Sequence, residues 1–212
     1  MTDIEKMKEL RKTGTTTVGL ICKEGVVLGT ERKSTMGYLV ASKESKKLFQ
    51  LDEHIGMTIA GIAGDAQAIA RLMSAELKLY KLQENKRISV KAAANLLANV
   101  MYSRRMFPYI VQLIVGGFDE QPRLYSFDPA GAIEEERKFF STGSGSPMAL
   151  GVLEERYREG MPCEDAKRLV ARAIKAATER DIASGGKGIV LAVIDSKGFR
   201  TVPEEETERL IK

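Results

Sequence analysis

Three threonines follow a glycine near the start of the chain, in the segment Gly14-Thr15-Thr16-Thr17. A threonine hydroxyl is a weak nucleophile unless a base lies beside it. A threonine at a chain N-terminus carries such a base in its own α-amine, whose reference pKa is about 8. Cleavage between Gly14 and Thr15 would create that N-terminus. The segment therefore indicates a hidden nucleophile, although a threonine run is also typical of the start of an ordinary strand.

Six further motifs follow this triplet. They are Thr30-Glu31-Arg32, Lys46-Lys47-Leu48-Phe49, Ile59-Ala60-Gly61, Gly64-Asp65-Ala66-Gln67, Ser141-Thr142-Gly143-Ser144-Gly145-Ser146-Pro147, and Glu179-Arg180-Asp181 leading into Ala183-Ser184-Gly185-Gly186. In this order and at these spacings, the chain from about Gly14 to its C-terminus resembles the catalytic β subunits of the archaeal type of 20S proteasome. The resemblance implies an N-terminal nucleophile hydrolase that acts as a threonine endopeptidase.

Two charged residues match the positions that activate the nucleophile in that family. Lys47 matches the lysine that lowers the local pKa and assists proton transfer, and Glu31 matches the acid that hydrogen-bonds and orients this lysine. A buried lysine needs such a counter-charge. The ordinary alternatives are a solvated strand lysine and a surface acid.

The resemblance also assigns groups to the amine and to the oxyanion. The backbone N–H of Gly61 would stabilise the tetrahedral oxyanion, where the loss of one donor costs on the order of 10²- to 10³-fold in rate. Asp181, Ser144 and Ser184 would form a network around the Thr15 amine and the nucleophilic water. Otherwise, Gly61 would merely end a strand, Asp181 would end a helix, and both serines would be turn residues.

Substrate contacts follow from the same match. Thr35, Gly61 and Ala63 would offer backbone hydrogen bonds to an extended peptide, as in strand addition to a sheet edge. The candidates for the first specificity pocket are Ser34, Ser45, Phe49, Ile59, Ala63 and Gln67. Because this pocket is largely uncharged, we expect a preference for apolar residues before the cut.

The expected processing uses the same nucleophile. The Thr15 hydroxyl would attack the carbonyl of Gly14, and the resulting ester would be hydrolysed. We therefore predict that residues 1–14 are a propeptide removed by autolysis, so that the chain is made as a zymogen, and that residues 15–212 form one catalytic domain. Residues 1–13 read as a short helix, with apolar side chains on one side.

Hydrophobic periodicity predicts the elements that position these residues. Strands are predicted over residues 15–22, 25–31, 37–42, 47–51, 55–61, 111–118, 123–127, 188–195 and 199–202, and helices over 65–84, 90–105, 147–157 and 163–180. The acidic segment after Pro203 begins a short terminal helix. This order favours two packed sheets with helices on both outer faces. It agrees with the fold that the resemblance implies, an α+β four-layer αββα sandwich of two antiparallel sheets.

Composition excludes several classes of protein. The 212 residues carry a formal net charge of +4, without the basic stripe that nucleic-acid binding requires. No apolar run approaches the roughly 20 residues of a membrane span, and the N-terminal segment lacks a secretory signal. Cys22 and Cys163 read as separate small hydrophobes in a reducing compartment, and His54 as a solvated turn residue. We therefore expect a cytoplasmic protein without metal or cofactor.

The family implies particular partners. Seven copies would form a ring, and two such rings would stack between rings of related α subunits in a 28-subunit α7β7β7α7 particle. An unfolding ATPase would supply unfolded polypeptides. The alternatives are a noncatalytic ring subunit, which would lack one or more of Thr15, Glu31, Lys47 and Asp181, and a small-molecule amidase on the same scaffold, which would act without ring formation. A two-ring bacterial protease of the same superfamily is a nearer alternative, but residues 181–186 fit the 20S type better.

Overall fold

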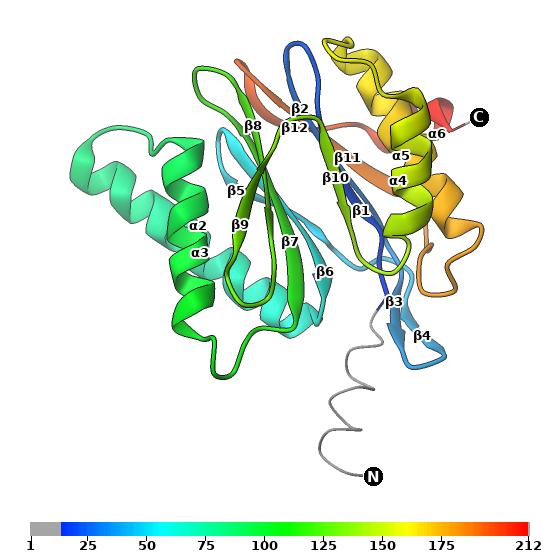
Figure 1. Cartoon of the computed structure of the whole chain (residues 1–212), viewed down its shortest axis with the longest axis horizontal. Helices are drawn as coiled ribbons and strands as arrows, with labels where there is room; N and C mark the ends of the chain where they lie inside the picture. The colour runs from blue at the N-terminus through cyan, green and yellow to red at the C-terminus, as the bar shows by residue number, and fades with distance from the viewer. Residues whose placement is uncertain (1–13, 212) are drawn as a thin grey trace.

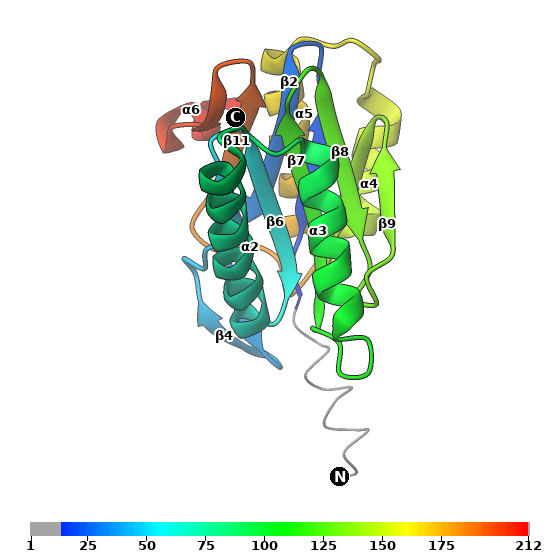
Figure 2. The ribbon, with the colours of Figure 1, turned by 90° about the vertical axis from the view of Figure 1, so that its left-hand side faces the viewer.

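The computed structural model describes residues 14–211, in which two antiparallel sheets pack face to face between two layers of helices (Figure 1). Figure 2 shows helices α2 (Ala63–Glu84) and α3 (Val90–Ser103) lying over one sheet. Helices α4 (Ser146–Arg156) and α5 (Cys163–Thr178) cover the other sheet, with the short α6 (Glu204–Leu210) beside them. The predicted αββα sandwich is therefore confirmed. None of the helices in residues 14–211 has the length and apolar character needed to cross a bilayer.

The first sheet carries the segment that follows Thr15. Its strand order is β10-β1-β2-β11-β12, with every neighbouring pair antiparallel. The strands are β1 (Thr17–Ile21), β2 (Gly25–Glu31), β10 (Phe139–Thr142), β11 (Ile189–Asp195) and β12 (Gly198–Thr201). Thr17 of β1 lies opposite Thr30 of β2 on one side and Thr142 of β10 on the other. The chain at Thr15 therefore enters the sheet between two strands rather than along an open edge.

The second sheet is a meander in the order β5-β6-β7-β8-β9. Its strands are β5 (Leu48–Asp52), β6 (Ile55–Gly61), β7 (Val111–Phe118), β8 (Pro122–Phe127) and β9 (Ile133–Glu136). A separate two-stranded hairpin, β3 (Ser34–Met36) with β4 (Leu39–Ser42), projects between β2 and β5. Figure 1 shows this hairpin beside the start of β1.

Apolar side chains fill three interfaces between the four layers. Two clusters lie between a sheet and its helices, and the third lies between the sheets and includes Val26, Leu28, Ile114 and Leu124. Helix α5 shows why its sequence folds as it does. Its buried residues Ala166, Leu169, Val170, Ala173, Ile174 and Ala177 recur at helical spacing. They give the helix one continuous apolar face against the sheet.

Most predicted elements match the observed ones within a few residues. Strands β2, β6 and β7 have the predicted bounds, and the helices differ by one or two residues at most ends. Strands β3, β9 and β10 were not predicted as separate elements. The helix predicted for residues 1–13 lies outside the described residues.

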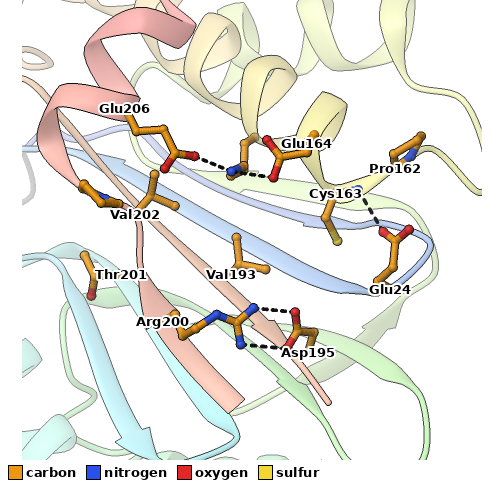
Figure 3. Close-up of a pocket in the computed structure, with 12 residues that line it drawn as sticks. Glu24, Pro162, Cys163, Glu164, Val193, Asp195, Arg200, Thr201, Val202 and Glu206 are labelled. Carbon is orange, nitrogen blue, oxygen red and sulfur yellow. Dashed lines mark hydrogen bonds and ion pairs between the residues drawn. The ribbon is translucent and has the colours of Figure 1, made fainter. Parts of the chain in front are cut away.

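Cys22 and Cys163 are joined by a disulfide, so the prediction of two separate thiols is wrong. The two residues are 141 positions apart in the sequence. Packing of α5 against β1 and β2 brings their Cα atoms to 5.1 Å, within the usual range for a disulfide. The backbone N–H of Cys163 also donates to Glu24 Oε2 at 2.9 Å (Figure 3). Sequence spacing could not show this pairing because it depends on the layer packing.

His54 is buried, with 3% of its surface exposed, so the prediction of a solvated turn histidine is wrong. Its Nε2 atom lies 2.8 Å from the carbonyl oxygen of Ile88, and its Nδ1 atom lies 3.2 Å from Asp52 Oδ2. The contact with Ile88 ties the β5–β6 turn to the segment before α3. The histidine is a structural residue of this turn.

Candidate active site

The residues predicted to perform chemistry come from strand ends and loops that meet beside Thr15. Glu31 is the last residue of β2, Lys47 immediately precedes β5, and Gly61 ends β6. Ser144 lies in the loop before α4, and Asp181 and Ser184 lie in the loop after α5. The two stacked sheets thus bring groups that are far apart in the sequence together at one end of the sandwich.

Lys47 makes the most direct contact with the candidate nucleophile. Its ammonium Nζ donates to Thr15 Oγ1 at 2.8 Å, and it also donates to Glu31 Oε1 and to the carbonyl oxygen of Lys33. The Lys47 side chain is 9% exposed and that of Glu31 is fully buried. All three donors of the ammonium are therefore used, and one of them is aimed at the Thr15 hydroxyl.

Glu31 is held as firmly as the lysine that it pairs with. Its Oε2 atom accepts from the backbone N–H groups of Lys33 at 2.6 Å and Gly185 at 3.0 Å. Its Oε1 atom also accepts from the N–H of Thr16 at 3.4 Å. Backbone donors cannot rotate away as side chains can. The carboxylate is therefore a fixed anchor for Lys47.

Burial lowers the pKa of Lys47, and the attraction of Glu31 offsets this effect only in part. A lysine in this position gives up its proton more easily than one in water. Because its Nζ lies within hydrogen-bond distance of Thr15 Oγ1, it is placed to exchange a proton with that hydroxyl.

A second polar network lies on the other side of Thr15. The hydroxyls of Ser144 and Ser184 each donate to Asp181 Oδ2 at 2.5 Å. The backbone nitrogen of Thr15 donates to Ser144 Oγ at 3.2 Å. The N–H of Ala183 donates to Asp181 Oδ1 at 3.3 Å. The structure thus brings Asp181, Ser144 and Ser184 together, and Ser144 links them to the Thr15 nitrogen.

The Gly14–Thr15 peptide bond lies directly against the nucleophile. The Thr15 hydroxyl donates to the carbonyl oxygen of Gly14 at 2.6 Å, and Thr15 is only 2% exposed. A Cβ atom added to Gly14 would lie 1.8 Å from Ala183 Cβ and 2.6 Å from Ser144 Oγ. A side chain at position 14 would therefore require the loop after α5 to move.

A cavity of about 300 Å³ opens beside Thr15. The predicted substrate-binding residues that line it are Ser34, Thr35, Ser45, Ile59, Gly61 and Ala63. Phe49 and Gln67 are not among its lining residues: Phe49 packs against the core under α2, and Gln67 is exposed. Gly61 has φ +127°, and a Cβ there would lie 2.2 Å from the carbonyl oxygen of Ile110, so the position suits glycine.

Sequence reasoning missed several residues of this region. Met36, Ala41, Lys46 and Ala66 also line the cavity, and they reach it from the hairpin, the segment before β5 and helix α2. No local pattern predicts that the hairpin contributes to the cavity beside the nucleophile. Lys46 and Ala66 lie within two of the family motifs, and the apolar character of Met36 and Ala41 is the signal that these two residues offer.

A larger groove of about 450 Å³ lies between α5, α6 and the β11–β12 hairpin (Figure 3). Its cations are paired within it: Arg200 with Asp195, and Lys167 with Glu164 and Glu206.

In the part of the chain that the structure describes, one group of potential metal ligands occurs, at Cys22, Glu24 and Cys163. Its two sulfurs are bonded to each other, and none of the three residues lines the cavity beside Thr15. We therefore assign the candidate site to the smaller cavity.

Comparison with known proteins shows that the chain is similar to proteasome subunits. The profile of the proteasome subunit family matches residues 11–194. A proteasome subunit beta of Methanocaldococcus fervens is 52% identical over 200 residues, which cover 93% of this chain and 89% of the relative. Those of Methanothermobacter thermautotrophicus and Methanopyrus kandleri are each 48% identical, covering 94% and 97% of this chain and 95% and 100% of the relatives.

Proposed function

The chain belongs to the proteasome subunit family, and we propose that it is a catalytic β subunit of the 20S core particle, a peptidase whose nucleophile is Thr15. One observation carries the choice of nucleophile. Lys47 donates to Thr15 Oγ1 at 2.8 Å while a fully buried Glu31 holds the lysine in place. A proton relay is therefore already in contact with the hydroxyl that must lose its proton.

The first reaction of this site is cleavage of its own chain. Lys47 in its neutral form takes the Thr15 hydroxyl proton, and Oγ1 attacks the carbonyl carbon of Gly14. The C–N bond then breaks, the Thr15 nitrogen receives a proton, and the amide becomes an ester. Water hydrolyses this ester, which releases residues 1–14 and leaves a free α-amine on Thr15. Lys47 acts as the base here because the Thr15 nitrogen is still an amide, which is too weakly basic to take the hydroxyl proton before its C–N bond breaks.

Cleavage of a substrate repeats the same steps on a foreign peptide bond. The freed α-amine and Lys47 handle the proton while Oγ1 forms an acyl ester with the substrate carbonyl. The N–H of Gly61 stabilises the oxyanion. Asp181, Ser144 and Ser184 hold the amine and the water that hydrolyses the ester. The substrate backbone pairs with Thr35, Gly61 and Ala63.

The assembly follows from the family. We infer homo-heptameric β rings stacked between rings of proteasome α subunits in a 28-subunit cytoplasmic particle. An unfolding ATPase delivers unfolded polypeptides to it. In this account residues 1–14 are the propeptide, and residues 15–212 are a single catalytic domain.

Peptide hydrolysis by the assembled particle tests the proposal. The chain is co-expressed with an archaeal proteasome α subunit, and fluorogenic peptides with an apolar, basic or acidic residue before the reporter are assayed. We expect cleavage after apolar residues and its loss in Thr15→Ala. Thr201→Ala, a threonine on β12 that does not line the site cavity, is the matched control and should retain activity. Wild-type rates in Thr15→Ala particles would show that another group is the nucleophile.

A further inference from the structure

We propose that Thr16 is a positioning residue, whose buried hydroxyl fixes Ser184 in the orientation in which Ser184 and Asp181 hold the Thr15 amine. The inference rests on the proposed function, since it deepens the account of the same site. Thr16 is absent from the residues that line the cavity, so it acts through its neighbours rather than on the substrate.

The three threonines of the triplet contact three different sets of groups. The Thr15 hydroxyl meets Lys47, and that of Thr17 lies 2.7 Å from Thr142 Oγ1 and accepts from Thr58 at 3.1 Å. The Thr16 hydroxyl instead lies 2.7 Å from Ser184 Oγ. If the triplet served only to begin a strand, the Thr16 hydroxyl would not need to contact the loop after α5.

The direction of the Thr16–Ser184 hydrogen bond can be deduced. A serine hydroxyl has one proton, and that of Ser184 is donated to Asp181 Oδ2 at 2.5 Å. Ser184 Oγ can therefore only accept from Thr16. The resulting chain runs from Thr16 through Ser184 to Asp181, and each bond strengthens the next.

Water has no access to replace this contact. Thr16 is fully buried and Ser184 is 1% exposed. A Cβ atom on Gly145 would lie 2.0 Å from Thr16 Oγ1, so the loop that carries Ser144 passes directly over the hydroxyl. The absence of a side chain at Gly145 makes room for the hydroxyl, and the close packing keeps it in one orientation.

Thr16 also joins the two halves of the site through its backbone. Its N–H donates to Glu31 Oε1 at 3.4 Å, and its carbonyl oxygen accepts from the N–H of Glu31 at 3.4 Å. One residue, adjacent to the nucleophile, thus contacts both the anchor of Lys47 and the partner of Asp181. This connection keeps the two networks in register around Thr15.

The test compares Thr16→Val with Thr16→Ser in the assembled particle, with mature Thr15 confirmed by mass. We expect Thr16→Val to lower kcat about tenfold while KM changes less than twofold, because one hydrogen bond of the network is lost. Thr16→Ser keeps the hydroxyl and should restore kcat. The matched control is Thr58→Val, which also removes a fully buried threonine hydroxyl. The Thr58 hydroxyl donates to Thr17 and does not contact Asp181. This control variant should keep kcat within twofold.

A double-mutant cycle separates positioning from a general loss of packing. If Thr16 acts through Ser184, Thr16→Val should add little to the loss already caused by Ser184→Ala. Full additivity, or wild-type kcat in Thr16→Val, would overturn the inference. If Thr16→Val does not assemble, Thr16→Ala takes its place in the same cycle. Activity in Thr15→Ala would instead overturn the proposed function, so the two failures are distinguishable.

Discussion

Two lysines of this chain have side chains of equally low exposure, and yet their pKa values shift in opposite directions. The side chains of Lys47 and Lys167 are each 9% exposed. Burial lowers the pKa of both, but at Lys47 the attraction and hydrogen bond of Glu31, with a smaller attraction from Asp181, do not compensate, and its pKa ends below the usual value. At Lys167, hydrogen bonds and attraction from Glu164 and Glu206 outweigh burial and raise the pKa.

The deeper burial of the Lys47 ammonium and the hydration of the carboxylates explain the difference. Glu164 and Glu206 are 70% and 41% exposed, and both reach from the surface into the groove of Figure 3. They remain hydrated while they pair with Lys167. Glu31 is fully buried, so its pair with Lys47 is taken out of water on both sides. One lysine is therefore a structural cation between α5 and α6, and the other is prepared to exchange a proton.

The largest expected effect follows from removing the lysine beside Thr15. Lys47→Met keeps the length of the side chain but removes the proton relay. We expect peptide hydrolysis and self-cleavage to fall about 10³-fold, as for loss of a general base. Steady-state rates and the intact mass of the precursor measure this change. Activity within tenfold of wild type would show that Lys47 is no more than a structural lysine.

The second effect concerns the region around Lys167, where the disulfide closes a loop of 141 positions. Reduction with a dithiol should lower the free energy of unfolding by about 2–4 kcal/mol, because the unfolded chain gains freedom. Denaturant unfolding with and without reductant measures it, and Cys22→Ala with Cys163→Ala is the control that should not respond to reductant. Two free thiols in the untreated protein by mass would contradict the disulfide.

Removing the Glu31 carboxylate, which anchors Lys47, should change the pH dependence of self-cleavage. Glu31 raises the pKa of Lys47 by attraction, so Glu31→Gln should lower that pKa further. Self-cleavage needs neutral Lys47, and its rate rises with pH as the lysine loses its proton. The rising limb should therefore move to lower pH, while the maximum rate falls about tenfold because the lysine is less well oriented. Precursor mass followed over time at several pH values measures both. A limb that moves to higher pH would refute this electrostatic role.

The smallest effect is expected at the structural lysine. Lys167→Met should keep peptide hydrolysis within twofold of wild type and lower the free energy of unfolding by about 1 kcal/mol, because its partners can return to water. Thermal unfolding and the same peptide assay test this. A loss of activity comparable to that of Lys47→Met would remove the distinction between the two lysines.

Much of the fold was predictable because its central elements carry strong local patterns. Strand β6 is an apolar run that ends at a glycine, and α5 repeats its apolar residues at helical spacing. Strand β9, with the sequence Ile-Glu-Glu-Glu, has no such pattern. It is a strand because β8 offers it a pairing edge, which a local pattern cannot reveal.

The site was predictable only to the extent that family motifs mark it. Resemblance predicts Thr15, Glu31, Lys47 and Asp181 as site residues, and the structure brings these four residues together. The contact of Thr16 with Ser184, the burial of His54 and the Cys22–Cys163 disulfide all depend on how distant segments pack. Periodicity and spacing report local structure and carry no information about such contacts.

The intact mass of the chain recovered from an assembled particle shows whether Thr15 is the nucleophile that cleaves the chain. The wild-type chain and Thr15→Ala are each co-expressed with an archaeal proteasome α subunit. We expect the wild-type chain to lose the mass of residues 1–14 and Thr15→Ala to keep its full mass. A Thr15→Ala chain that loses the same segment, or an active particle whose wild-type chain keeps it, would contradict the assignment of Thr15 as the nucleophile.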